Sequence, residues 1–459
     1  MNHFIQQLAA ISPTALSGSV VRTEGMVAAV AGFPAPLGAL VEIDRQAGKP
    51  VPAEVIGFRE ASTLVYPLGD MTGVRHGSRV RLIRTSRYLA VGSGLLGRVI
   101  DAHGNTIDGR AMPPLADRVP LERRPPAAFE RPRIDQPLTT GVRVLDGLLT
   151  CGVGQRMGIF AGSGVGKSVM LGMMAKYTSA DVNVIGLIGE RGREVNEFIE
   201  RDLGPVGLAR SVVIVATSDE PALVRVQAAM AATAVAEHFR DQGKSVLLIM
   251  DSLTRFAMAQ REIGLAAGEP PTTKGYPPSV FALLPRLVER TGRSAKGSIT
   301  AFYSVLVEGD DTNDPVADTV RGLIDGHCVL SRKIAGRGHY PAVDLLESIS
   351  RLMNDIVQPE HRAAAQTIRE LLAVYRDHED LISIGAYRNG ANPMVDTAIA
   401  MRDDLQRYLR QAIDEKSSLE QSRNDLLALA KKCQTVRPVP KAPPVPAAVA
   451  AAAPITRRA

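Results

Sequence analysis

The feature that most constrains the fold of this chain is one glycine-rich stretch, MGIFAGSGVGKSVMLG, at residues 157–172. An apolar strand end precedes the glycines, and residues 168–178 have helical composition. A glycine-rich loop between a strand and a helix is the setting of a phosphate-binding loop, in which backbone N–H groups face phosphate oxygens. The usual pattern has glycine where this chain has Ala161, but a small residue is sufficient there if its backbone dihedrals are ordinary. We therefore predict a nucleotide-binding loop.

The residues of this loop have distinct expected roles. Gly164 and Gly166 allow backbone N–H groups to approach the phosphate oxygens. Lys167 is expected to reach the β- and γ-phosphates of ATP, and Ser168 to bind Mg²⁺. The alternative interpretation is an incidental glycine-rich turn. The predicted ATP-binding residues are Ala161, Gly162, Ser163, Gly164, Val165, Gly166, Lys167, Ser168 and Val169.

Two acidic residues follow other apolar runs that we expect to be strands. Asp251 ends the run in SVLLIMDSLTRF, where an aspartate can hold the Mg²⁺ shell. Glu190 ends the run in VIGLIGERGREV, where a carboxylate near the γ-phosphate can polarise the attacking water. The carboxyl ends of parallel strands meet at one edge of a sheet, so both acids should converge on Lys167. An ordinary strand-end aspartate, and a glutamate that only pairs with a neighbouring arginine, remain the alternatives.

The arrangement of apolar runs predicts three structural regions. Residues 18–89 contain short β-rich pieces separated by glycine and proline turns, which is typical of a small closed β-barrel. Residues 138–356 alternate apolar runs with helical segments, which indicates a mostly parallel sheet flanked by helices. Residues 359–433 are rich in Ala, Leu, Arg, Gln and Glu and are expected to be helical. The expected strands of the sheet are 157–161, 182–189, 211–216, 245–250 and 298–305.

The predicted fold class is therefore α/β, with a small N-terminal β-barrel, a central RecA-like P-loop ATPase domain and a C-terminal helical domain. Residues 95–110 are expected to form a hairpin with turns at His103-Gly104 and Asp108-Gly109. The predicted bounds are 1–17 for an N-terminal helix, 18–94 for the barrel, 95–358 for the ATPase domain with a linker at 121–137, 359–435 for the helical domain and 436–459 for a disordered Pro/Ala-rich tail.

Charge and composition favour a cytoplasmic protein without a specific nucleic-acid partner. The net charge is +6, but residues 436–459 carry four cations and no acid, which leaves the rest nearly neutral. The apolar runs are shorter than the ~20 residues that a membrane span needs, and the first residues lack a signal-peptide pattern. Cys151, Cys328 and Cys433 have no metal-ligand spacing, and we expect free thiols.

The two ends of the chain differ from its middle. Phe4, Ile5, Leu8 and Ile11 form one apolar stripe at helical spacing, which must dock on another surface because so short a helix is marginal alone. That surface is either a partner or the chain's own barrel. The tail at 436–459 has too few large apolar side chains to fold, and its four cations allow only a transient contact with an anionic membrane.

Several longer motifs make the family recognisable. The chain resembles the hexameric ATPases related to the catalytic subunit of the rotary ATP synthases, and within that group it most resembles the ATPases of the flagellar (type III) protein-export apparatus. The resemblance covers roughly residues 18–430. The motifs that carry it are GERGREV, MDSLTRFAMAQRE, GYPPSVFALLPRL, SITAFYSVLVEGDDTNDP and SRKIAGRGHYPAVDLLESISRLM.

The resemblance implies roles for single residues. Glu190 matches the catalytic carboxylate of the family. Arg191 and Arg255 match arginines that approach the γ-phosphate, and Tyr340 in GHYPAVD matches the aromatic that packs on adenine. Arg351 in SISRLM matches the arginine that enters the site of the neighbouring subunit, which implies a homo-hexameric ring.

Further partners follow from the resemblance alone: a regulator or stator-like protein bound by the N-terminal helix, the export gate, chaperone–substrate complexes, and a peripheral contact with the inner membrane. Three alternatives stay open. A virulence-type secretion ATPase has closely similar motifs. A rotary synthase subunit would have Thr in place of Ser168 and an acidic cluster within 381–396. An RNA translocase would need more closely spaced aromatics in 18–90.

Overall fold

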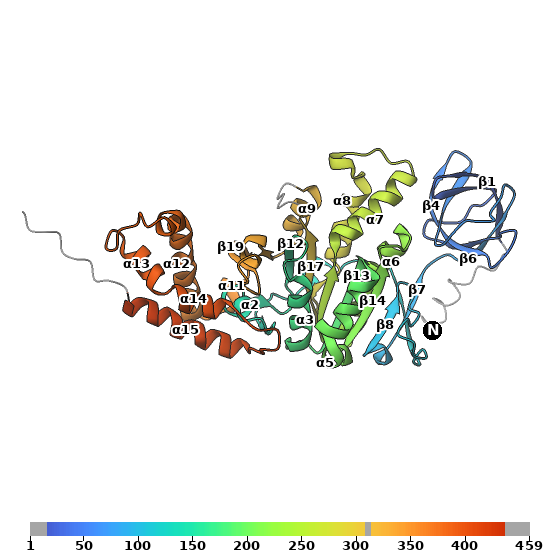
Figure 1. The fold of residues 1–459 in the computed structure, drawn as a ribbon. Helices are drawn as coiled ribbons and strands as arrows, with labels where there is room; N and C mark the ends of the chain where they lie inside the picture. Colours follow the sequence, from blue (N-terminus) through green and yellow to red (C-terminus); the bar gives the residue numbers. More distant parts are fainter. Residues whose placement is uncertain (1–15, 308–313, 437–459) are drawn as a thin grey trace, which may run out of the picture.

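A computed structural model describes residues 16–307 and 314–436 of the chain. It is elongated, with a barrel at one end, a sheet covered by helices in the middle and a group of helices at the other end (Figure 1). This arrangement confirms the predicted fold class. The apolar stripe within residues 2–11 and almost the whole of the tail at 436–459 lie outside the described residues.

The N-terminal barrel is closed by six strands in the order β1-β2-β5-β4-β3-β6. Its interior is filled by small and β-branched side chains, among them Val30, Val41, Ile43 and Val65, all of which are buried. Two short strands outside the barrel, β7 (Tyr88–Val91) and β9 (Asp117–Pro120), pair with each other. The barrel strands are β1 (Ser17–Glu24), β2 (Val27–Ala31), β3 (Leu40–Ile43), β4 (Val51–Arg59), β5 (Ser62–Pro67) and β6 (Arg79–Arg84).

The central sheet runs in the order β19-β18-β12-β17-β15-β13-β14-β8, and β16 (Gly292–Arg293) pairs with β17 beside this path. Its pairs along the path are parallel except β18 with β19. The strands are β8 (Arg98–Asp101), β12 (Arg156–Ala161), β13 (Val182–Glu190), β14 (Ser211–Thr217), β15 (Ser245–Asp251), β17 (Ser298–Leu306), β18 (Gly326–Leu330) and β19 (Val343–Ser350).

Alternate residues of the sheet belong to two separate cores. Val246 and Leu248 of β15 pack with α6 and α7 on one face, whereas Leu247 and Ile249 pack with α3 on the other. Such nearly continuous apolar strands are typical of a parallel sheet that is covered on both faces. The helices of this domain include α2 (Arg143–Leu148), α3 (Lys167–Tyr177), α4 (Gly192–Glu197), α5 (Gly204–Ala209), α6 (Ala222–Asp241), α7 (Leu253–Ala266), α8 (Pro278–Val288), α9 (Pro315–Leu323) and α10 (Arg332–Ala335).

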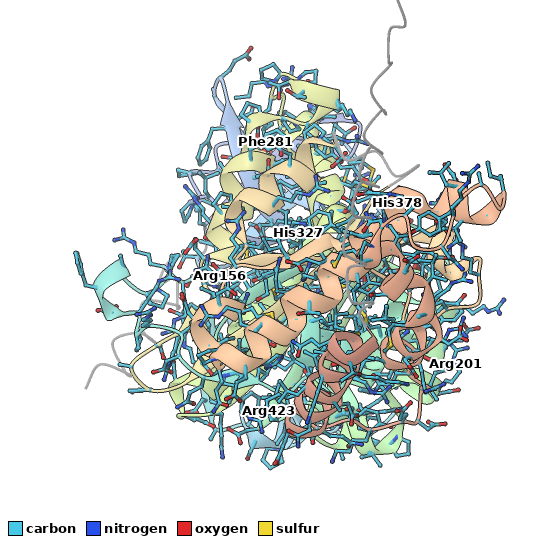
Figure 2. All side chains as sticks on the ribbon, turned by 90° about the vertical axis from the view of Figure 1, so that its left-hand side faces the viewer. Arg156, Arg201, Phe281, His327, His378 and Arg423 are labelled. Carbon is cyan, nitrogen blue, oxygen red and sulfur yellow. The ribbon has the colours of Figure 1, made fainter. Side chains whose placement is uncertain are left out.

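The C-terminal helices pack on the α3 side of the sheet through a shared apolar core. Figure 2 looks at the molecule from this end, with His378 of α12 and Arg423 of α15 on helices in front of the sheet. Cys151, Cys328 and Cys433 are buried and free, as expected. Among the described residues no helix is long and apolar enough to cross a membrane. The helices are α11 (Met353–Ile356), α12 (Pro359–Ser383), α13 (Pro393–Ala400), α14 (Arg402–Leu409) and α15 (Leu419–Val436).

The chain reversal predicted for residues 95–110 is present, but its first arm has a second role. The N–H of Asp101 donates to the carbonyl of Asn105 at 2.9 Å, and the N–H of Ile107 donates to the carbonyl of Val99 at 3.0 Å. The same arm, β8, extends the central sheet by pairing in parallel with β14. The segment that follows the barrel is thereby fixed to the ATPase domain.

Candidate functional site

The glycine-rich loop connects β12 to α3 at the carboxyl edge of the sheet. Gly164 and Gly166 have φ values of +76° and +87°, a region that side-chain-bearing residues rarely adopt. Ala161 is the last residue of β12 and is buried. The non-glycine residues with positive φ in the described part of the chain are Glu60 and Lys274, so Ala161 has an ordinary backbone. The departure from the usual pattern therefore leaves the loop conformation intact.

Lys167 and Asp251 form an ion pair at the centre of the site. Their side chains are 11% and 5% exposed. Burial alone would lower the pKa of Lys167, but the nearby carboxylates of Asp251 and Glu190 outweigh it and raise the pKa. The hydroxyl of Ser304 on β17 donates to Oδ1 of Asp251 at 2.5 Å. Asp251 is therefore held from two sides at the end of its strand.

Glu190 lies beside this pair but is held less tightly. Its Oε1 is 3.7 Å from Nζ of Lys167, and that oxygen is buried without a hydrogen-bond partner. Burial raises the pKa of Glu190 to about 7, helped by the charge of Asp251 and opposed by that of Lys167. A buried carboxyl group with a free oxygen and a pKa near neutrality has the properties of a general base. The predicted convergence of Lys167, Glu190 and Asp251 is thus present in the structure.

The two arginines next to Glu190 occupy different environments. The side chain of Arg255 on α7 lies against Gly189, where an added Cβ would be 3.0 Å from Cβ of Arg255. Its Nε is buried without a hydrogen-bond partner. Arg191 is 81% exposed and lies 3.7 Å from Glu194. Arg255 therefore lies within the site, whereas Arg191 is on its solvent side.

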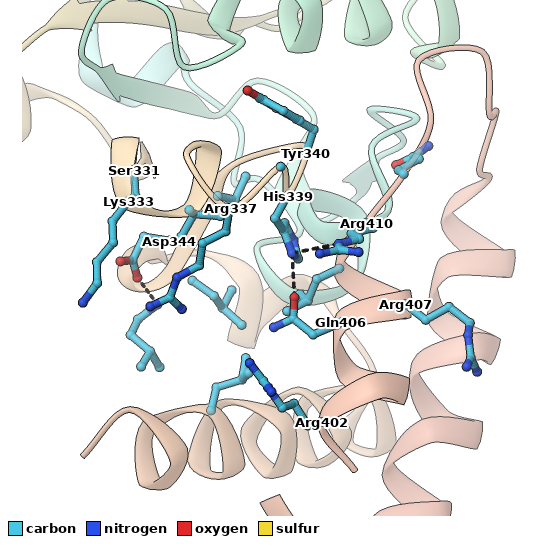
Figure 3. Close-up of a pocket in the computed structure, with 18 of the residues that line it drawn as sticks. Ser331, Lys333, Arg337, His339, Tyr340, Asp344, Arg402, Gln406, Arg407 and Arg410 are labelled. Atoms are coloured by element: carbon cyan, nitrogen blue, oxygen red, sulfur yellow. Dashed lines mark hydrogen bonds between the residues drawn. The ribbon is translucent and has the colours of Figure 1, made fainter. Parts of the chain in front are cut away.

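The ring of Tyr340 lies against the glycine loop at Gly166. An added Cβ on Gly166 would be 3.3 Å and 3.4 Å from Cδ1 and Cε1 of the Tyr340 ring. The ring is 46% exposed. It borders a cavity of about 1330 Å³ between the ATPase domain and the C-terminal helices, which also contains Lys333, His339 and Gln406 (Figure 3).

Arg351 lies at the amino ends of the parallel strands, whereas the glycine loop of its own chain lies at their carboxyl ends. Its N–H donates to the carbonyl of Asp325 at 3.0 Å, and the side chain of Asp325 accepts from the N–H of Arg156 at 3.0 Å. Arg156 begins β12 and Ala161 ends it, a separation of roughly 16 Å along a strand. Arg351 is exposed there. The structure therefore gathers Lys167, Glu190, Asp251, Arg255 and Tyr340 around the loop, leaves Arg191 on the solvent side, and places Arg351 elsewhere.

Two residues of the site were not expected from the sequence. Arg332 on α10 lies against the loop, since an added Cβ on Gly162 would be 2.6 Å from its Nε. Ser304 supports Asp251, as described above. Arg332 belongs to the motif SRKIAGRGHYP, but a charge pattern alone does not indicate which arginine turns toward the loop. Ser304 lies in a strand that is buried at all but its last residue. Serine is unusual in such a position, and this was the sequence signal that could have pointed to it.

The fold and site define a P-loop ATPase whose nucleotide-binding domain lies between a barrel and a helical domain. Residues 141–350 match the model of the ATP synthase alpha/beta family, nucleotide-binding domain, and residues 357–428 match the T3SS EscN ATPase C-terminal domain. The flagellum-specific ATP synthase of Bacillus subtilis (strain 168) is 54% identical over 407 residues, 88% of this chain and 93% of that protein. The chain belongs to the ATP synthase alpha/beta family, and the predicted family and ATPase class are confirmed.

Other relatives include secretion ATPases. The type 3 secretion system ATPase of Xanthomonas euvesicatoria is 50% identical over 416 residues, 90% of this chain and 94% of that protein. A solved structure of the assembled ATPase EscN from the enteropathogenic E. coli type III secretion system matches with a TM-score of 0.85 at 44% identity. That match covers 90% of this chain and 100% of EscN.

Proposed function

We propose that this chain hydrolyses ATP in a six-membered ring that energises protein export by the flagellar type III apparatus. The observation that carries the enzymatic part is the meeting of Lys167, Glu190 and Asp251 beside the glycine loop. Support for the export role comes from the flagellar relative and from the match of residues 357–428 to the C-terminal domain of a secretion ATPase. The virulence-type alternative rests on the Xanthomonas relative. Flagellar or virulence genes beside the gene for this chain would distinguish the two.

In the proposed mechanism the glycine loop binds the phosphates and Glu190 acts as the base. Lys167 would transfer its contacts from the two carboxylates to the phosphate oxygens, which leaves Glu190 free to accept a proton from water. Its free Oε1 and its raised pKa suit that role. Arg255 would stabilise charge that develops on the γ-phosphate.

Ser168 and Asp251 fit a Mg²⁺ site. Both offer hard oxygen ligands, and Mg²⁺ usually takes one or two protein oxygens together with phosphates and water. Ser168 stands in the first turn of α3, and Asp251 is fixed at its strand end by Ser304 and Lys167. When bound, Mg²⁺ would neutralise charge on the β- and γ-phosphates.

Arg351 would complete the site of a neighbouring subunit. Arg351 is too far from the glycine loop of its own chain to act in that site. In a head-to-tail ring, a surface of each subunit packs against a different surface of the next, so Arg351 would reach the neighbouring site. An assembled relative, EscN, supports the ring. An arginine donated in this way stabilises transition-state charge.

The remaining contacts of the chain are proposed from the resemblance. EscN was also solved with its central stalk EscO, which supports a stalk-like partner for this chain. The N-terminal stripe would bind a regulator, and the tail would touch the inner membrane from the cytoplasm. The export gate and chaperone–substrate complexes would be further partners. Deletion of residues 2–11 should abolish copurification of the regulator and leave the melting temperature nearly unchanged.

Two substitutions test the enzymatic proposal. Lys167→Ala should weaken ATP binding because it removes the cation that meets the phosphates. Glu190→Gln should bind ATP normally and lose turnover by at least about 10²-fold, because the amide has a similar shape but accepts a proton poorly. Glu200→Gln, an exposed change on the following π-helical turn η3 (Phe198–Leu203), is the matched control. Near-normal turnover by Glu190→Gln would refute the assignment of the base.

A further inference from the structure

Gln411 joins three separate segments at the junction between the ATPase domain and the C-terminal helices. It lies two residues beyond the end of α14 and is only 6% exposed. Its backbone N–H donates to the carbonyl of Tyr340 at 3.0 Å. Gln411 is therefore bonded directly to the residue whose ring lies over Gly166 of the glycine loop.

Both polar atoms of the Gln411 side chain are hydrogen-bonded at this junction. Its Oε1 accepts from the N–H of Arg143 at 2.7 Å. Its Nε2 donates to the carbonyl of Gly141 at 2.9 Å and to that of Glu415 at 2.7 Å. A buried amide with all these bonds made is costly to misplace, because each unmade bond leaves a buried polar group unsatisfied.

A second link ties the same loop to α14. Nδ1 of His339 lies 2.7 Å from Oε1 of Gln406, and Nε of Arg410 lies 3.4 Å from the same ring nitrogen (Figure 3). His339 immediately precedes Tyr340 and is 6% exposed. The backbone at His339 and Tyr340 is thus tied to the C-terminal domain by two separate links.

We propose that Gln411 is a positioning residue that holds Tyr340 in place for the base of the nucleotide and so makes base recognition depend on the seating of the C-terminal helices. The inference rests on the proposed function, in which Tyr340 packs on adenine. The glycine loop itself has no bond to Gln411. Binding of phosphates should therefore be independent of Gln411, whereas binding of a ligand that carries a base should depend on it.

The test compares two ligands on the full-length chain, Mg·ATP and Mg·tripolyphosphate, the second of which has no base. Gln411→Leu should weaken ATP binding by about tenfold, because small displacements of a positioning group have large effects. Its affinity for tripolyphosphate should stay that of the wild type. Gln421→Leu, an exposed change on α15, is the matched control. A purely structural role of Gln411 would weaken both ligands together, which would overturn the inference.

Gln411→Glu and Tyr340→Ala complete the experiment. A glutamate keeps the acceptor for Arg143 but sets a carboxylate against two carbonyl oxygens. The ratio of ATP to tripolyphosphate affinity should recover in part at low pH, because the protonated carboxyl group can donate to one of those carbonyls. A ratio that does not change with pH would overturn the inference.

If Tyr340→Ala loses selectivity for ATP while Gln411→Leu retains it, the inference fails and the proposed function stands. If Tyr340→Ala also retains selectivity, the proposed base platform fails as well.

Discussion

Two glutamates in different parts of the molecule share burial and pKa but differ in their partners. The side chains of Glu190, beside the glycine loop, and Glu54, between barrel and ATPase domain, are both 14% exposed. Burial raises the pKa of each to about 7. Oε2 of Glu54 accepts from Nε2 of Gln227 at 2.8 Å and lies 2.7 Å from Nε of Arg87 in an ion pair, whereas Oε1 of Glu190 is buried without a hydrogen-bond partner. A raised pKa alone therefore does not identify a reactive carboxyl group; Glu190 differs from Glu54 in its buried, unbonded oxygen and in its place beside Lys167.

The surroundings of Glu54 explain why it is a structural group. It projects from β4 of the barrel, Gln227 belongs to α6, and Arg87 lies on the segment between barrel and sheet. The guanidinium of Arg87 also donates to Gln227. A mostly apolar cavity of about 610 Å³ borders this group. The Glu54–Arg87–Gln227 group thus fixes the barrel to the ATPase domain, and changes there should affect stability instead of turnover.

The largest expected effect is a loss of turnover when Arg351 is removed from the nucleotide site. Arg351→Ala should reduce turnover by about 10³-fold or more, because transition-state charge loses its partner. ATP binding and the melting temperature should stay unchanged, since the side chain is exposed in the single subunit. Turnover measured at saturating ATP, with calorimetry on the same samples, checks both parts. A turnover near that of the wild type would remove Arg351 from the mechanism.

The second effect belongs to the barrel junction. Glu54→Ala should lower the free energy of unfolding by about 3 kcal/mol, because it leaves the buried Arg87 without its anion. Turnover per folded subunit should be retained. Glu24→Ala, which breaks exposed pairs with Arg22 and Arg59 on the same barrel, should cost less than about 1 kcal/mol. Denaturant titration of the two variants makes the comparison, and equal losses would contradict the structural role of Glu54.

The third effect is a pH dependence that only one of the two glutamates should produce. The base must be deprotonated, so with a pKa of about 7 for Glu190 turnover should rise by about tenfold between pH 6 and pH 8. Glu54→Gln should leave this profile unchanged, although Glu54 has a similar pKa. A profile that shifted in Glu54→Gln would mean that the barrel junction controls the chemistry.

The raised pKa of Glu190 also determines how the stability of the fold changes with pH. The pKa of Glu190 in the folded chain is about 7 and its ordinary value is 4.5, so folding favours the protonated form. Its contribution to stability is present below pH 4.5 and is lost as pH rises toward 7. Glu190→Gln removes this loss, so the variant should gain stability over the wild type above pH 7. Melting curves at pH 5 and pH 8 measure the difference.

The smallest effect should come from Ser304, whose hydroxyl donates to Asp251. Ser304→Ala removes one buried hydrogen bond, so the free energy of unfolding should fall by about 1 kcal/mol and the KM for Mg·ATP should rise by a few-fold. The change lies in the same buried strand as Thr300, where Thr300→Ala provides a control away from the loop. A loss of turnover as large as that of Arg351→Ala would mean that Asp251 has a greater role than holding Mg²⁺.

Much of the fold and the centre of the site were predictable from local pattern. The glycine loop and the strand-end acids are adjacent to long apolar runs, and parallel topology brings such ends together. Strands β18 and β19 lack long apolar runs and were not expected. Partners across the sheet or between domains, such as β8 with β14 or Gln411 with Tyr340, depend on long-range packing that a single sequence does not display.

A site shared between neighbouring subunits can be tested by mixing two inactive variants, Glu190→Gln and Arg351→Ala. In randomly mixed rings, about a quarter of the subunit boundaries would pair an intact Glu190 with an intact Arg351 from the next subunit. Once mixing has been verified with differently tagged subunits, turnover should be near that fraction of the wild-type value. Rings that are demonstrably mixed and yet remain inactive would contradict a site shared between neighbouring subunits.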